Sequence, residues 1–251
     1  MQTIPSLPAK PVAEVFHPDL TRLPRLTIAR KITRRLFILV IRLAVGLLLR
    51  KEVSGMENFP YRKPALLVFN HLGDADAIVG LAVIPVAFDG LAKAELYDLP
   101  VVGKLMEAYG VIWVHRGRPD RRALRAALNG LREGRVIAIA PEGRESLTGG
   151  LEAGTHGAAY LALSADVPIV PVTFTGTENN RIYPNLKRFR RTGITVTVGP
   201  AFRLENQANL RKSIDWGTER IMQVLASQLP EEYRGVFQGK PEGINDGWPR
   251  D

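Results

Sequence analysis

The chain has 251 residues, of which 45% are hydrophobic, a formal net charge of +9 at pH 7 and no cysteine. This length and apolar content allow one folded domain with a sizeable core and an appended N-terminal element. The lack of cysteine excludes disulfide bonds, cysteine-ligated zinc sites and thiol nucleophiles, and it fits a reducing compartment.

The N-terminal part divides into two segments. Residues 1–19 predict an extended segment, interrupted by prolines and without the apolar core of a secretory signal. Residues 20–51 contain nine cations and no acidic residue, so the rest of the chain has a net charge of +9 − 9 = 0. The nine are Arg22, Arg25, Arg30, Lys31, Arg34, Arg35, Arg42, Arg50 and Lys51. A nucleic-acid-binding protein would more often spread its cations over the folded domain, so no nucleic-acid partner is expected.

The most apolar stretch, residues 36–49, lies within this basic segment. It has 14 residues and contains Arg42, so it is too short and too polar at its centre to span a bilayer. It predicts a basic amphipathic helix lying at a membrane surface, with Lys31, Arg34, Arg35 and Arg42 within an arc of roughly 100°. Each cation near anionic lipid would contribute about 1 kcal/mol to attachment. A core helix with a solvated basic edge is the alternative.

Residues 52–234 alternate apolar and amphipathic stretches, which indicates an α/β domain. Residues 177–193 are polar and basic, and are expected to form a solvated loop, with a second membrane-facing or carrier-facing patch as the alternative. Residues 235–251, rich in Gly, Pro and charge, are expected to form a loosely ordered tail. Strands are expected at residues 65–69, 111–114, 136–139, 169–174 and 195–198. Helices are expected at residues 76–84, 101–109, 120–133, 156–164 and 213–229.

A histidine and an aspartate stand five positions apart after the first of these strands, in the block Asn70-His71-Leu72-Gly73-Asp74-Ala75-Asp76. If the strand ends at Asn70 and a helix begins soon afterwards, His71 and Asp76 can meet across one turn. The carboxylate would then orient the imidazole and stabilise the imidazolium formed when a general base takes a proton. Asp74 is the alternative partner, and a hydrogen-bonded core histidine is the alternative role for His71.

Three further blocks follow: Gly110-Val111-Ile112-Trp113-Val114-His115-Arg116, Ala140-Pro141-Glu142-Gly143-Arg144-Glu145-Ser146 and Val167-Pro168-Ile169-Val170-Pro171-Val172. In this order and at this separation the four blocks resemble the motifs of the PlsC-type glycerolipid acyltransferases, over roughly residues 52–201. The segment Lys93-Ala94-Glu95-Leu96 resembles one often found between the first two motifs of that family.

The resemblance implies a mixed central sheet flanked by helices, and transfer of an acyl group from acyl-CoA or acyl carrier protein to the free hydroxyl of a lysophospholipid. The first candidate acceptor is 1-acyl-sn-glycerol 3-phosphate, and no metal or cofactor is expected. Membrane lipids are the expected partners, at the cytoplasmic face of the membrane with peripheral or monotopic attachment. His71 would be the general base and Asp76 its partner.

The resemblance also assigns binding residues. Arg116 would bind the acceptor phosphate, unless it is a surface arginine. Glu142 and Gly143 would form the acceptor-binding loop, and Lys93 would assist the thioester or anchor a loop.

The chain departs from the family pattern where the acceptor is expected to bind. The third motif usually reads Phe-Pro-Glu-Gly-Thr-Arg-Ser, whereas here Ala140, Arg144 and Glu145 replace three of its residues. Arg144 would supply the displaced cation; if it points away, phosphate recognition weakens and another head group becomes the better candidate. Gly73 stands where a small hydroxyl residue is common. Glycerol 3-phosphate, another lysolipid acceptor, and a non-catalytic lipid-binding protein therefore remain as alternatives.

Overall fold

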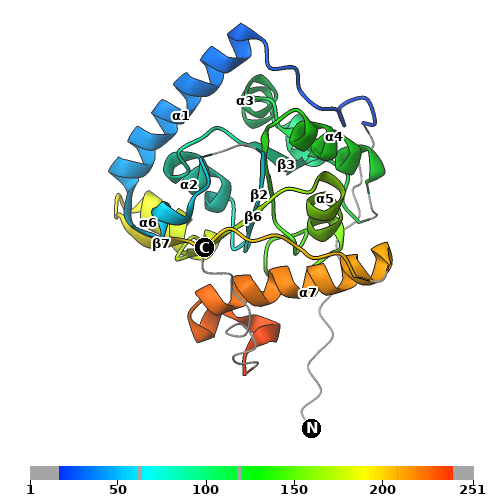
Figure 1. Cartoon of the computed structure of the whole chain (residues 1–251). Helices are drawn as coiled ribbons and strands as arrows, with labels where there is room; N and C mark the ends of the chain where they lie inside the picture. The colour runs from blue at the N-terminus through cyan, green and yellow to red at the C-terminus, as the bar shows by residue number, and fades with distance from the viewer. Residues whose placement is uncertain (1–16, 62–63, 118–119, 208, 240–251) are drawn as a thin grey trace.

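The computed structural model describes residues 17–61, 64–117, 120–207 and 209–239, which form a seven-stranded sheet flanked by helices (Figure 1). The strand order is β1-β7-β6-β2-β5-β3-β4, and among these neighbours β6 and β7 alone are antiparallel. The expected α/β architecture with a mixed central sheet is confirmed. The strands are β1 (Leu49–Ser54), β2 (Ala65–Phe69), β3 (Asp89–Lys93), β4 (Ile112–Val114), β5 (Val136–Ile139), β6 (Ile169–Thr175) and β7 (Thr192–Val198).

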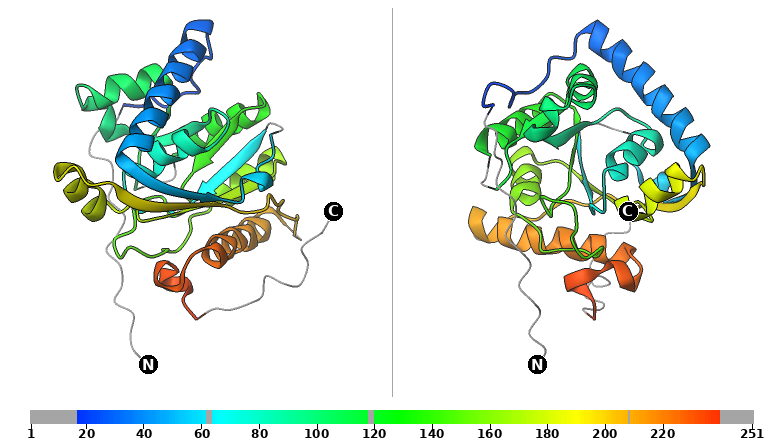
Figure 2. Two further views of the ribbon diagram at one scale, coloured as in Figure 1. Left: turned by 90° about the vertical axis from the view of Figure 1, so that its left-hand side faces the viewer. Right: turned by 180° about the vertical axis from the view of Figure 1, so that it is seen from behind.

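Helices cover both faces of the sheet, and each face has its own apolar core. One core packs against α4, α5 and α7, and the other against α1, α2 and α6. Strand β2 shows why: Leu66 and Val68 face the first core, whereas Ala65 and Leu67 face the second, as the two-residue period of a strand requires. Figures 1 and 2 show α1 and α7 on opposite sides of the molecule. The helices are α1 (Ile28–Leu48), α2 (Ala75–Val83), α3 (Val102–Tyr109), α4 (Arg121–Arg132), α5 (Gly157–Ala165), α6 (Asn179–Lys187) and α7 (Leu210–Gln228).

All ten elements expected between residues 65 and 229 are present, but among the strands and α-helices of the described residues three others were not predicted. β1 is charged and almost fully exposed, and β3, with the sequence DGLAK, has no β-branched residue. α6 contains Pro184 and lies where a loop was expected, so the loop prediction is wrong for this helix. β1 pairs with β7, and it contains the boundary expected between the basic segment (residues 20–51) and the α/β domain (residues 52–234). The basic N-terminal segment therefore ends inside the sheet.

Helix α1 faces the domain differently from the sequence-based expectation. Arg34 is 5% exposed and donates to the carbonyls of Tyr109 (2.8 Å) and Gly110 (3.0 Å) at the end of α3. Arg42 donates to the carbonyls of Ala82 (3.1 Å) and Ile84 (3.3 Å) at the end of α2. Free carbonyls and the helix dipole attract cations to helix C-termini. The expectation that these two arginines face lipid is therefore wrong, because they fasten α1 to the domain.

The outward side of α1 is apolar. The exposed fraction is 67% for Leu43, 73% for Leu47 and 79% for Ile28. Across the described ranges, no helix is long and apolar enough to cross a membrane. We call this surface the apolar stripe; it comprises Ile28, Ile32, Leu36, Leu39, Val40, Leu43 and Leu47.

The two ends of the chain lie largely outside the described residues, which leaves most of the extended segment and the tail as predictions. The tail begins in an ordered way, because Phe237, in a short 3-10 helix (Gly235–Phe237), is buried. Val236 donates its backbone N–H to the carbonyl of Leu151 (3.0 Å). The expectation of a loose tail is therefore wrong for these first residues.

Candidate active site

Four neighbouring parallel strands end at one edge of the sheet, in the order β2, β5, β3, β4. His71 stands just beyond β2, Glu142 beyond β5, Lys93 at the last position of β3 and Arg116 beyond β4. With neighbouring strands about 4.8 Å apart, the backbones of His71 and Arg116 lie about 14 Å apart. Ligands of open α/β sheets bind beyond the carboxyl ends of the strands. The fold therefore brings four of the predicted residues to one edge of the sheet, the edge at which open α/β sheets bind ligands.

His71 and Asp76 form a hydrogen-bonded pair. Nδ1 of His71 lies 2.8 Å from Oδ2 of Asp76, which is fully buried. The same oxygen accepts the backbone N–H groups of Leu72 (2.7 Å) and Gly73 (3.0 Å), so the carboxylate is held in place before any substrate binds. The His71 side chain is 25% exposed, and within the described part of the chain its Nε2 has no hydrogen-bond partner. Nε2 is thus the nitrogen available to take a proton.

The surroundings of His71 favour its charged form. Burial lowers the pKa of the imidazole, but the hydrogen bond to Asp76 and the charges of Asp76, Glu145 and Glu142 together raise it above the ordinary value of 6.5. A base with a raised pKa accepts a proton more readily, and the adjacent carboxylate stabilises the imidazolium.

Asp74 has other partners. Its Oδ2 accepts a hydrogen bond from the hydroxyl of Tyr183 (2.7 Å), and its backbone N–H donates to Oδ1 of Asn179 (3.0 Å). Both partners belong to α6. The geometry therefore pairs His71 with Asp76. Asp74 instead joins α6 to the loop between β2 and α2, residues 70–74, which we call the histidine loop.

Glu142 holds the histidine loop in place through a hydrogen bond to its backbone. It is 1% exposed; Oε1 accepts the backbone N–H of His71 (3.0 Å) and Oε2 that of Glu152 (2.8 Å). The backbone N–H of Ser146 also donates to the carbonyl of His71 (2.7 Å). Burial raises the pKa of Glu142 to about 7, although the hydrogen bonds from Glu152 and His71 lower it. The structure thus places this carboxylate under His71 as a support, not on the acceptor-binding surface where the resemblance put it.

Gly143 lies in the loop after β5 with φ +73°, a left-handed conformation that favours glycine. The next residue, Arg144, turns inward. Its side chain is 6% exposed, and Nε donates to Oε2 of Glu152 at 2.6 Å. The guanidinium is therefore buried in an ion pair within the loop, and is not an exposed cation of the kind that Arg144 was expected to supply.

Two cations remain at the edge, each beside a carboxylate. Nζ of Lys93 lies 3.7 Å from Oε1 of Glu145, and a guanidinium nitrogen of Arg116 lies 3.7 Å from Oε1 of Glu95. Nε of Arg116 and Oε2 of Glu95 are both buried without a hydrogen-bond partner among the described residues. Such groups are costly to leave unpaired, so Arg116 retains capacity to bind an anion.

Two asparagines that sequence reasoning did not single out also shape the site. Nδ2 of Asn179 donates to Oε2 of Glu145 (3.1 Å) while Oδ1 binds the histidine loop. Asn70 exchanges hydrogen bonds with the backbone of Phe174 (2.9 and 2.8 Å), which joins the end of β2 to β6. The place of Asn70, directly before the histidine at a strand end, was a usable signal; Asn179 had none.

A second histidine–aspartate pair repeats the spacing of five. Nδ1 of His115 lies 3.1 Å from Asp120, but its Nε2 accepts the backbone N–H of His17 (3.0 Å), and Asp120 caps α4. This pair is structural. Spacing alone therefore does not identify a base, whereas His71 is distinguished by an Nε2 at a strand end that has no partner among the described residues.

Comparisons with known proteins identify the family of the chain. The family model described as "Acyltransferase" matches residues 50–175. A 1-acyl-sn-glycerol-3-phosphate acyltransferase from Borreliella burgdorferi is 32% identical over 187 residues, which are 73% of this chain and 72% of that protein. The human 1-acyl-sn-glycerol-3-phosphate acyltransferase beta is 35% identical over 153 residues, 60% of this chain and 54% of the human protein. The chain thus spans about half of this human relative.

A solved structure shares the fold. The crystal structure of the 1-acyl-sn-glycerophosphate (LPA) acyltransferase PlsC from Thermotoga maritima superposes with a TM-score of 0.59, covering 80% of this chain and 84% of that one. The sequence identity is 21%, so this likeness concerns the fold alone.

Proposed function

Because the chain belongs to the PlsC-type acyltransferase family, we propose that it moves an acyl group from a thioester to the free hydroxyl of a lysophospholipid, with 1-acyl-sn-glycerol 3-phosphate as the first candidate acceptor. The observation that carries the proposal is the His71–Asp76 pair, with Nε2 free at the edge where Lys93 and Arg116 also lie.

The pair supplies base chemistry without a covalent intermediate. Nε2 of His71 takes the hydroxyl proton as the acceptor oxygen attacks the thioester carbonyl carbon, forming a tetrahedral adduct. The carbon–sulfur bond then breaks, and the thiolate receives the proton from the imidazolium. Asp76 keeps Nδ1 protonated and stabilises the imidazolium between these steps. The thioester is already activated, so no enzyme nucleophile is needed.

Acceptor binding rests on Arg116 and Lys93. A guanidinium binds a phosphate through two parallel hydrogen bonds, and a bound phosphate would draw Arg116 from Glu95, which lies 3.7 Å away. The inward position of Arg144 leaves fewer cations at this edge than the family motif implies. Glycerol 3-phosphate or another lysolipid head group is therefore the second candidate.

The proposal also places the protein peripherally on a membrane, with the apolar stripe of α1 toward the acyl chains. Contiguous apolar surface of this kind typically marks an interaction site. The donor, acyl-CoA or acyl carrier protein, would approach the same edge of the sheet as the acceptor.

The test combines purified protein, acyl-CoA or acyl carrier protein thioester, and a panel of lysolipids with glycerol 3-phosphate, followed by lipid product analysis. His71→Ala is compared with His156→Ala, because the His156 side chain is 68% exposed and pairs with Asp215 on the surface. Product from lysophosphatidate that is lost in His71→Ala and kept in His156→Ala supports the proposal. Product from another acceptor moves the assignment within the family. No His71-dependent product with either donor overturns it in favour of a lipid-binding role.

A further inference from the structure

A cleft of about 920 Å³ lies beneath α1, away from the candidate active site. It is bordered by Asp89 and Val136, the first residues of β3 and β5. Parallel strands place their first and last residues at opposite edges of a sheet, and the active-site loops follow the last ones. The cleft therefore belongs to the edge opposite His71.

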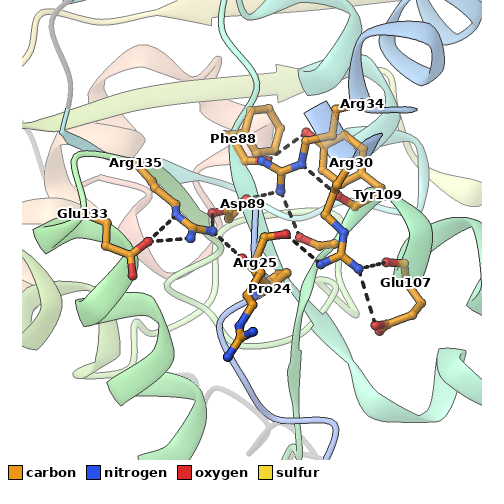
Figure 3. A network of polar contacts seen from close by, with 11 residues as sticks. Pro24, Arg25, Arg30, Arg34, Phe88, Asp89, Glu107, Tyr109, Glu133 and Arg135 are labelled. Carbon is orange, nitrogen blue, oxygen red and sulfur yellow. Dashed lines mark hydrogen bonds and ion pairs between the residues drawn. The ribbon is translucent and has the colours of Figure 1, made fainter. Parts of the chain in front are cut away.

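The cleft carries an excess of positive charge. It is lined by the two acids Asp89 and Glu133 and by five cations, so its formal charge is 5 − 2 = +3. Asp89 is paired with Arg34 and, at 3.3 Å, with Arg135, which also pairs with Glu133 (Figure 3). The acids are thus already neutralised. The five cations are Lys31, Arg34, Arg35, Arg42 and Arg135.

Lys31 and Arg35 are the cations available to a ligand. Both are exposed and, in the described portion of the chain, their side chains form neither a hydrogen bond nor an ion pair. They stand four residues apart on α1, so they lie on successive turns with their Cβ atoms about 5–6 Å apart. Arg42 lies on the same side of the helix and binds the carbonyls that end α2. Two free cations on successive turns suit one phosphate group.

The cleft adjoins the apolar stripe. With 100° between successive helical residues, Lys31 and Arg35 fall between the side of α1 that carries buried Val45 and the side that carries exposed Leu36. Leu39 both lines the cleft and belongs to the stripe. A molecule with its acyl chains along the stripe would therefore have its head group at Lys31 and Arg35.

We propose that this cleft binds the head group of an anionic glycerophospholipid from the membrane in which the apolar stripe lies. The inference rests on the membrane attachment proposed above for α1. It requires no acyl transfer, and the ligand is distinct from the lysolipid that reacts at His71. The phosphate lies against Lys31 and Arg35, and the acyl chains lie along Leu39 and the stripe.

The test measures binding of dihexanoyl phosphatidylglycerol, below its micelle concentration, to the full chain by titration calorimetry. Dihexanoyl phosphatidylcholine and inorganic phosphate are the comparison ligands. Lys31→Gln/Arg35→Gln removes the two free cations, and Ala87→Trp fills the cleft without changing its charge. Arg211→Gln/Lys212→Gln is the matched control, since it removes two exposed cations from α7.

We expect phosphatidylglycerol to bind the parent protein and the α7 control alike. Its Kd should be about 10- to 30-fold weaker in the double cleft variant, because two charge-assisted contacts to the phosphate are lost, and similarly weakened in Ala87→Trp. Phosphatidylcholine and inorganic phosphate should bind much more weakly than phosphatidylglycerol. Sedimentation with phosphatidylcholine vesicles, run in parallel, reports the attachment of α1 independently of the cleft.

Four outcomes would overturn the proposal. Weaker binding to the double cleft variant with undiminished binding to Ala87→Trp would assign the effect to diffuse surface charge. Undiminished binding to both cleft variants would place the lipid elsewhere. Equal binding of inorganic phosphate would make the cleft a free-anion site. No binding of phosphatidylglycerol to the parent protein would remove the site altogether. No acyl donor is present in these measurements, so they report lipid binding even if the protein proves to have no transferase activity.

Discussion

Arg34 and Arg35 are neighbours on one helix, yet the structure gives them opposite energetic roles. Arg34 is 5% exposed, pairs with Asp89 and donates to two carbonyls at the end of α3 (Figure 3). Arg35 is exposed and, as far as the described residues go, has no side-chain partner. Arg34→Met and Arg35→Met therefore make a matched pair, with the same chemical change one position apart.

We expect Arg34→Met to lower the free energy of unfolding by about 3–5 kcal/mol, the cost of removing one member of a buried ion pair. The two orphaned carbonyls add to this cost, at about 1–3 kcal/mol for each buried unpaired group. Arg135, 3.3 Å from Asp89, offsets part of it. Arg35→Met should stay within about 0.5 kcal/mol of the parent protein.

The assay is equilibrium unfolding in urea, with the free energy extrapolated to zero denaturant. The double variant Arg34→Met/Asp89→Asn should lose about 1–3 kcal/mol less than the sum of its two single variants, because the orphaned carboxylate is gone. Equal stability of Arg34→Met and Arg35→Met would refute the reasoning and restore the view that the whole cationic face of α1 points outward.

Four further predictions concern the site. His71→Ala should lower kcat by about 10²- to 10⁴-fold in the acyl transfer assay, the usual contribution of a general base. Only neutral imidazole accepts a proton, and the pKa of His71 is raised, so kcat/KM should fall as the pH drops through a midpoint above 6.5. In Asp76→Asn that midpoint should move to lower pH. An unmoved pH–rate profile would show that Asp76 does not act on the base. Arg116→Gln should raise KM for a phosphorylated acceptor about 10-fold or more while KM for acyl-CoA stays constant, because a charged hydrogen bond contributes about 1.5–3 kcal/mol; an unchanged acceptor KM would dismiss its role. A Cβ at Gly73 would lie 2.5 Å from Oδ1 of Asn179, so Gly73→Ser should lower the midpoint of thermal unfolding. Adding Asn179→Ala should recover part of this loss. No recovery would assign the loss to the clash with the backbone carbonyl of Thr177 at 2.9 Å.

Local patterns predicted the parts of the site that depend on neighbours in sequence. The strand ending at Phe69 and the helix starting at Ala75 leave a short turn, so a spacing of five suffices to join His71 and Asp76. The turn at Gly143 was predictable in the same way, since a glycine after a buried strand commonly adopts a positive φ.

Other features depended on partners far away in sequence. The period of α1 was predictable, but the direction of its cationic face was decided by the carbonyls that end α2 and α3, which lie 40 and 75 residues further on. Arg144 turned inward because Glu152 is buried beside it. α6 forms although a helix-interior proline costs about 3 kcal/mol, and buried Ile182 and the contact of Tyr183 with Asp74 help to offset that cost. None of these partners is marked by spacing.

The junction between α1 and β1 has a mechanical consequence. α1 ends at Leu48 and β1 begins at Leu49, where it pairs with β7, so no flexible linker separates the helix from the sheet. Arg191 strengthens the junction by donating to the carbonyls of Gly46 (2.8 Å) and Leu49 (2.6 Å). The helix and the sheet must therefore rotate as one rigid body. Any surface that holds α1 flat also fixes the tilt of the strands and the height of His71 above that surface. The distance between the site and the surface is therefore fixed by the fold and does not vary with the motion of a flexible linker.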